Sequence, residues 1–238
     1  MAGRYQRWLI AKGHFAPGSA SVAKLIERLR KESWIPPEGG EAITTIDNEY
    51  GIDEAKKKAA QTKPLPKTID KEWLDDVDRE EIRLVWPVAG GGITYPLTHA
   101  PEGAAAYTFE IHRSGEYVCP VAKTITPLAT VCNCGEDISF AWDPDEVVPA
   151  FEKSTGIFTE CEECSRTFDP SKVTSMITNP FDGSKEEVRG GGAYRFAIVI
   201  DCGSSYVEDA RIAFAPALVA ILENEFNRSF YEIGTLSR

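Results

Sequence analysis

Long apolar runs are missing from this chain of 238 residues. No stretch approaches the roughly 20 consecutive apolar residues that a membrane-spanning helix requires. The apolar run near the N-terminus is also too short for a secretory signal. The hydrophobic content of 42% is nevertheless enough for an ordinary buried core. We therefore expect a folded protein in the cytoplasm with no membrane partner.

Positive charge is also scarce. The sequence has 26 Lys and Arg against 37 Asp and Glu, which gives a formal net charge of -11. Nucleic-acid binding draws its energy from Lys and Arg, so this balance argues against it. The acidic excess is concentrated in residues 132–170, where ten Asp and Glu face only Lys153 and Arg166. A basic protein partner is the expectation that this charge supports.

Recognised catalytic motifs are missing as well. The three histidines, His14, His99 and His112, do not have the spacing of a histidine metal site. No Gly-X-Ser-X-Gly motif is present. The glycine triplets at residues 90–92 and 190–192 lack the following helix of a phosphate-binding loop, so we interpret both as turns. The sequence therefore favours a protein that is not an enzyme.

One pair of side chains could still do acid–base chemistry. Glu110 and His112 are two residues apart on a predicted strand, which places both on one face of a sheet. A solvated polar face explains the same pattern, and we favour that interpretation. Asp201 follows a strongly apolar run, and the Cys-Gly-Ser-Ser after it is typical of a turn that follows a buried strand.

Four of the six cysteines form two close pairs. Cys132 and Cys134 have one residue between them, Cys161 and Cys164 have two, and 26 residues separate the pairs. Such an arrangement can bring four sulfur atoms to the corners of a tetrahedron, as a structural zinc ion requires. The first pair is closer than usual, and Gly135 gives the turn there its backbone freedom. We predict a zinc ribbon whose four thiolates leave no metal position open for catalysis.

Other roles for the cysteines are weaker interpretations. A redox pair at Cys161 and Cys164 is disfavoured because the two glutamates between them oppose formation of a thiolate. Four unpaired thiols that cluster only in the sequence are the remaining alternative. Cys119 and Cys202 stand outside the pairs, and we expect both to be buried thiols.

Hydrophobic periodicity predicts two amphipathic helices. In residues 20–32 four apolar residues recur with the spacing of one helical face, and Ser19 or Ser21 is expected to cap this helix. The four are Val22, Leu25, Ile26 and Leu29. Pro216 begins a second helix, and Asn227 ends it because asparagine tolerates the left-handed conformation. Strands are predicted at residues 5–12, 81–87, 105–112, 193–201 and 230–236.

These elements predict an α+β fold in which a mostly antiparallel sheet carries two packed helices, in an arrangement of ferredoxin-like type. We expect residues 1–131 and 171–238 to form one discontinuous domain, with residues 132–170 inserted as the zinc ribbon. Residues 53–78 are rich in lysine, then in proline and acid. They are expected to form an exposed connecting segment that can carry a short helix.

Three functions fit these features. We favour a non-enzymatic, zinc-stabilised protein-binding module whose acidic surface engages a basic partner, and an immunity or antitoxin-type protein is one concrete form. The first alternative is an enzyme with a cleft between the sheet and the zinc ribbon, using Glu110, His112 or Asp201. The second is a zinc-ribbon nucleic-acid factor that uses the first forty residues, where seven Lys and Arg face three Glu.

Overall fold

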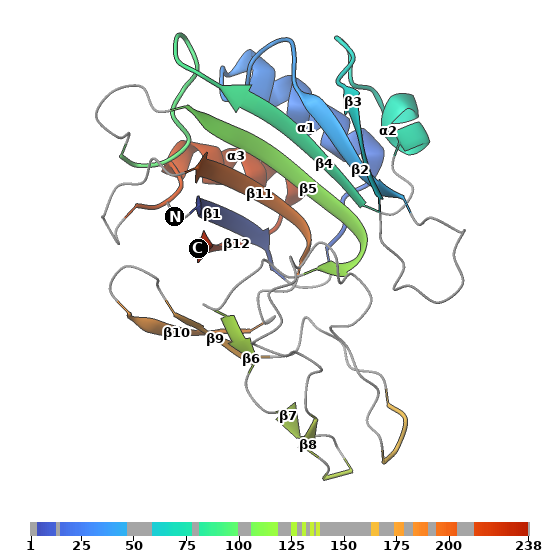
Figure 1. Ribbon diagram of the computed structural model, residues 1–238, viewed down its shortest axis with the longest axis vertical. Coiled ribbons are helices and arrows are strands. Elements are labelled where there is room, and N and C mark those ends of the chain that lie inside the picture. Colours follow the sequence, from blue (N-terminus) through green and yellow to red (C-terminus); the bar gives the residue numbers. More distant parts are fainter. Residues whose placement is uncertain are drawn as a thin grey trace.

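The main body of the protein is an α+β fold, as the sequence predicts. The computed structural model describes residues 4–12, 15–46, 59–77, 81–99, 106–118, 125–127, 130–131, 134–135, 137–138, 163–166, 174–178, 183–189, 194–203 and 212–237. Within these residues a seven-stranded antiparallel sheet is accompanied by three helices (Figure 1). The predicted α+β class and mostly antiparallel sheet are therefore confirmed, with three helices among the described residues where two were expected, whereas the predicted zinc-ribbon insertion stays a prediction.

The main sheet has the strand order β12-β1-β11-β5-β4-β2-β3, and every neighbouring pair is antiparallel. Its strands are β1 (Arg4–Ala11), β2 (Glu41–Ile46), β3 (Ala59–Pro64), β4 (Glu81–Val88), β5 (Tyr107–Val118), β11 (Tyr194–Gly203) and β12 (Phe230–Ser237). β11 lies inside the sheet and is buried on both faces, which confirms the prediction from its continuous apolar run.

One part of the sheet is a split β-α-β unit. The chain runs from β11 through helix α3 (Pro216–Phe226) to β12, and β1 lies between these two strands and is antiparallel to both. β5 lies on the other side of β11. A ferredoxin-like sheet has four strands, and the four compared with it here are β12, β1, β11 and β5. The main sheet is larger, because β4, β2 and β3 continue it beyond β5.

All three helices pack against the same face of the main sheet. Besides α3 they are α1 (Ser19–Lys31) and α2 (Lys71–Val77), and their apolar residues share one core with alternate residues of the strands. α2 and β3 come from the segment expected to be an exposed connection, but Leu65, Leu74 and Val77 tie it to this core. None of the described helices is both long and apolar enough to cross a membrane.

The helix ends agree with the sequence in one case and differ in the other. α3 begins at Pro216 and is closed by Asn227, whose φ of 49° and ψ of 49° are left-handed, as predicted. The predicted serine cap of α1 is wrong, because Gly18 occupies the capping position and makes no side-chain bond. The Ser19 hydroxyl donates instead to Asp75 of α2 and accepts a hydrogen bond from Arg113 of β5. The first turn of α1 is thereby tied to its neighbours.

The face of the main sheet opposite the helices carries a second, smaller apolar cluster. Its residues from the sheet are Trp8, Ile10, Tyr194, Ala197, Val199 and Ile233, and Val188 of strand β10 packs onto them. β10 (Lys185–Arg189) belongs to a three-stranded sheet with β9 (Thr174–Thr178) and β6 (Ile125–Pro127) (Figure 1). This second sheet lies within the long insertion between β5 and β11. It covers part of a face that the sequence had led us to expect in solvent.

Gly40, directly before β2, provides a test of the packing between the main sheet and its loops. Its φ is +97°, and a Cβ atom there would lie 2.8 Å from the Val85 carbonyl oxygen and from the Leu65 and Trp86 side chains. Gly39 also has a positive φ, of +82°, but nothing lies within 4 Å of its Cβ position. Gly39→Ala is expected to cost about 1 kcal/mol of unfolding free energy from backbone strain alone.

Gly40→Ala adds steric overlap to the same strain, so we expect a cost of about 3 kcal/mol or more. Urea unfolding of the two variants beside the unchanged protein measures both values. Equal costs for the two substitutions would contradict the close packing at Gly40.

Candidate functional site

The polar residues that the sequence singled out meet on the face of the main sheet opposite the helices. Because side chains alternate along a strand, Thr108, Glu110 and His112 of β5 all point to this face. β11 is paired with β5 so that Val199 lies opposite Glu110 and Ala197 opposite His112. A small residue opposite the imidazole leaves room for side chains from further along β11 and from β1.

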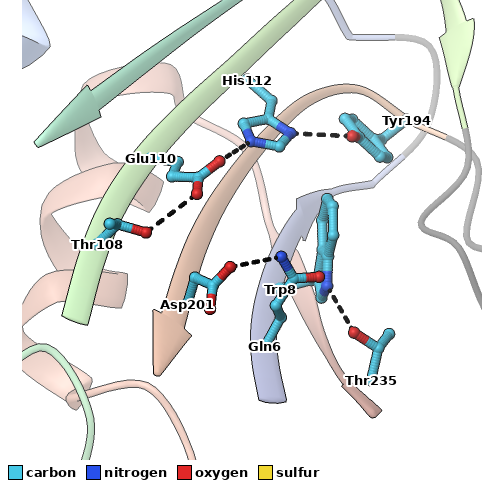
Figure 2. Close-up of polar contacts among 8 residues, drawn as sticks. All are labelled: Gln6, Trp8, Thr108, Glu110, His112, Tyr194, Asp201 and Thr235. Carbon is cyan, nitrogen blue, oxygen red and sulfur yellow. Dashed lines mark hydrogen bonds and ion pairs between the residues drawn. The ribbon is translucent and has the colours of Figure 1, made fainter. Parts of the chain in front are cut away.

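A chain of hydrogen bonds joins these side chains (Figure 2). The Thr108 hydroxyl donates to Glu110 Oε1 at 3.0 Å, and Glu110 Oε2 lies 2.7 Å from His112 Nε2. On the other side of the ring, His112 Nδ1 lies 3.1 Å from the hydroxyl of Tyr194. Glu110, His112 and Tyr194 are only 3%, 2% and 1% exposed. The solvated polar face favoured from the sequence is therefore wrong.

The protonation state of the chain follows from what each group can donate. Burial lowers the pKa of His112, against the opposing effect of Glu110, so the ring is neutral at neutral pH. A carboxylate only accepts, so Nε2 carries the ring proton and donates it to Glu110. Nδ1 then has a free lone pair, to which Tyr194 donates its hydroxyl hydrogen. The order is hydroxyl, imidazole, carboxylate.

Glu110 remains a carboxylate in this arrangement. Burial by itself raises the pKa of Glu110, but the hydrogen bond from His112, the charge of that ring when it is protonated, the positive charge of Arg83 and the hydrogen bond from Thr108 together bring it below its ordinary value. Burial keeps the His112 ring neutral at neutral pH. We therefore base the ionised state of Glu110 on the donated hydrogen bonds and on Arg83.

Trp8 of β1 encloses the imidazole from the side. Its ring lies edge-to-face with His112, with 5.3 Å between ring centroids, and 5.7 Å from the Tyr194 ring. The indole Nε1 donates to the Thr235 hydroxyl of β12 at 3.1 Å (Figure 2). The site is therefore shared by adjacent strands of the sheet, and Trp8 and Tyr194 also contribute to the cluster that Val188 covers.

Asp201 lies on the same face but at the end of β11. Its carboxylate accepts hydrogen bonds from Gln6 Nε2 at 2.9 Å and from the backbone N–H of Gly203 at 2.8 Å. Gly203 has a φ of +58°, so the chain bends there directly after the buried strand. Asp201 thus closes the end of β11 and joins it to β1.

The hydrogen-bonded chain has the order of an activated nucleophile, in which a base accepts a hydroxyl hydrogen and an acid orients the base. Chemistry on an outside substrate also requires that the hydroxyl be reachable. Tyr194 is among the most deeply buried side chains of the described part. The geometry accordingly supports an internal network better than a reaction site.

Tyr194 is the member of this network that the sequence analysis missed. It is separated from His112 by 82 residues. The sequence shows that Tyr194 lies at the start of a strongly apolar strand. It does not show the register of β11 against β5, which places Tyr194 beside His112. Only the pairing of β11 with β5 brings the two together.

The described structure covers two of the four predicted zinc ligands. Cys134 and Cys164 are exposed, whereas Cys132 and Cys161 lie outside the described residues. Each described cysteine is followed by a residue with positive φ, +97° at Gly135 and 54° at Ser165. Among the described residues no group of three or more potential ligands forms a metal site. The predicted set of four is therefore neither assembled nor excluded.

The remaining two cysteines have separate outcomes. Cys202 is 5% exposed, and burial raises the pKa of its thiol to about 11, so it is protonated at neutral pH as predicted for a buried thiol. Cys119 lies outside the described residues.

Comparisons with known proteins add no relative. No protein-family model, no curated protein and no solved structure matches the chain. A functional proposal therefore rests on the residues and geometry of this chain.

Two tyrosines allow a matched test of the network. Tyr194→Phe removes the hydroxyl that donates to His112 Nδ1, and this buried nitrogen then loses the hydrogen bond. We expect the free energy of unfolding to fall by about 1–3 kcal/mol. The Tyr107 hydroxyl is also buried but has no hydrogen-bond partner in the described structure. Tyr107→Phe should change stability by no more than about 0.5 kcal/mol, or stabilise the protein. Chemical denaturation of both variants measures the difference, and equal effects would contradict the assigned bond.

Proposed function

We propose that the protein is a non-enzymatic binding protein that is stabilised by zinc and engages a basic protein partner. The observation that carries this proposal is the burial of Glu110, His112 and Asp201, the side chains best suited to acid–base chemistry. Each is at most 4% exposed and has hydrogen-bond partners inside the fold. The chemistry that an enzyme would present to a substrate is used here to join strands.

The zinc part of the proposal concerns Cys132, Cys134, Cys161 and Cys164. Cys134 lies between β7 (Thr130–Val131) and β8 (Asp137–Ile138), which are paired antiparallel, whereas Cys132 lies outside the described residues. Gly135, between the two strands, has a φ of +97°, a backbone conformation that suits the tight turn which closely spaced metal-binding cysteines require. Four thiolates would close the coordination sphere, so zinc would stabilise the residue 132–170 module and take no part in a reaction.

The charge part of the proposal depends on the same module. Residues 132–170 contain ten Asp and Glu and two basic residues, and four thiolates on a divalent metal would add negative charge. A surface of this sign accelerates capture of a basic protein and repels nucleic acid. An immunity or antitoxin-type protein that blocks a basic toxin is a function of this kind.

An enzyme is the second candidate, because the bonded order Tyr194, His112, Glu110 is that of an activated hydroxyl. This candidate requires the covering second sheet to move and expose Tyr194. A turnover that disappears in both Tyr194→Phe and His112→Gln, while the zinc content stays unchanged, would favour it over the binding function.

Metal analysis of protein purified without added metal tests the zinc part. We expect about one zinc per chain, and its loss together with a lower melting temperature in Cys161→Ser, because three remaining thiolates bind zinc less tightly. Cys202→Ala serves as the control, since that buried thiol lies outside the predicted site and the variant should keep its metal. A folded protein without metal would overturn this part of the proposal.

The binding part is tested by affinity purification of the protein from its own host. A basic protein should be recovered in a stoichiometric complex that weakens as salt is raised. Replacement of Glu162 and Glu163 by Gln should slow association with the partner several-fold without loss of zinc. Charges at the edge of a protein–protein interface act mainly on the association rate. Recovery of chaperones alone, or a complex indifferent to salt and to the substitution, would count against a basic partner.

A further inference from the structure

The insertion between β5 and β11 leaves and re-enters the main sheet at one place. Val118 near the end of β5 is paired with Tyr194 at the start of β11. Tyr194 is also the residue whose hydroxyl His112 accepts from, at 3.1 Å. The hydrogen-bonded chain therefore lies at the root of the insertion.

The second sheet of the insertion rests on the same residues. Val188 of β10 is 9% exposed and packs in one cluster with Trp8 and Tyr194. The three residues before it on β10, Lys185, Glu186 and Glu187, are exposed. Val188 is the one apolar side chain of β10, so β10 buries little apolar area against the main sheet. A change in the residues beneath Val188 can therefore weaken the contact.

We propose that the chain Glu110, His112, Tyr194 is a pH-sensitive switch, and that protonation of His112 releases the β6-β9-β10 sheet from the main sheet. Protonation puts a hydrogen on Nδ1, so the bond reverses: the ring donates to the Tyr194 oxygen, and the Tyr194 hydroxyl must point its own hydrogen elsewhere in the cluster. It also places a charge against Trp8 in an apolar cluster. Both changes act inside the cluster that contains Trp8, Tyr194 and Val188.

The charges around the ring determine the direction of the switch. Glu110 on the same strand favours protonation, whereas Arg83, paired with His112 from β4, opposes it. β11 contributes Asp201 at its far end, Tyr194, and Arg195, which donates to the Ser114 carbonyl at 3.4 Å. β1 presents Gln6 and Trp8, β12 presents Thr235 with Ile233, and β10 presents Val188. Burial outweighs Glu110, because the pKa of His112 lies below its ordinary value.

The sign of the effect follows from that direction. A group whose pKa is depressed by folding contributes stability that is complete above its unfolded pKa of about 6.5 and is lost as the pH falls toward its folded value. The docked state of the second sheet should therefore be complete at neutral pH and weaken below about pH 6.5. Because His112 is not a predicted zinc ligand, this proposal does not depend on the zinc site.

Hydrogen exchange of the full-length protein, corrected for the intrinsic effect of pH, tests the switch between about pH 7.5 and about pH 5. Amides of β9 and β10 should lose protection by up to about tenfold per pH unit, the limit for one proton, while β1 and β4 keep theirs. His112→Gln should abolish this dependence, and His99→Gln, which removes an exposed histidine, should leave it unchanged.

A second variant and a direct measurement cover the case in which His112→Gln does not fold. Tyr194→Phe removes the bond in both protonation states of the ring but keeps the imidazole that titrates, so the release at low pH should persist in this variant. The imidazole signals of His112 in NMR should titrate with the same midpoint as the loss of β10 protection. Zinc release, followed with a chelating dye, should be the same in His112→Gln as in the unchanged protein.

Three results would overturn the proposal. The first is protection of β10 that does not change down to about pH 5. The second is the same pH dependence in His112→Gln. The third is a loss of protection in β1 and β4 together with β10, because that pattern is global unfolding.

Discussion

β11 is buried on both faces, and the arrangement of the other elements follows from this constraint. From Phe196 to Ile200 its side chains are fully covered, alternately by the helices and by the layer on the opposite face. A strand in that position accepts polar neighbours only if their hydrogen bonds are complete. Glu110 and His112 on the adjacent strand meet the requirement by bonding to each other, to Thr108 and to Tyr194.

The same network favours one register of β5 against β11. A slip of one residue would turn Glu110 and His112 toward the core beneath the helices, where Phe109 and Ile111 now pack. It would also separate His112 from Tyr194 and leave a buried charge without its partners. A buried carboxylate that is held by hydrogen bonds contributes little net stability compared with apolar residues, but it destabilises any pairing that takes its donors away. Specificity of strand pairing is therefore the main structural role of this pair.

The parts of the fold that the sequence predicts are those with a strong local pattern. The apolar stripe of α1, the proline start and asparagine end of α3, and the run that forms β11 are each contained in one segment. The shared face of Glu110 and His112 follows from the period of a strand. α2 has only seven residues, too few for its periodicity to stand out from the charged segment around it.

The site itself depends on information that is not local. Nothing near His112 indicates Tyr194, because their contact is created by the register of two strands. The covering of the polar face was hidden for a related reason. β10 reads Lys-Glu-Glu-Val-Arg, and a single valine among charged residues gives no hydrophobic pattern. A solvated face was the natural prediction from β5 alone, and the insertion made it wrong.

The proposed function requires one chain to combine a fixed core with a separate binding part, and the position of the insertion is compatible with this. Its two ends are held next to each other by antiparallel pairing of β5 and β11, so the entropy cost of closing this long loop is met by the ladder of the main sheet. The acidic excess of residues 132–170 lies beyond that root, whereas the groups capable of proton transfer lie at it. The two proposals, recognition by acidic charge and control by protonation, therefore concern two different parts of the insertion: residues 132–170 and the place where its ends join the main sheet.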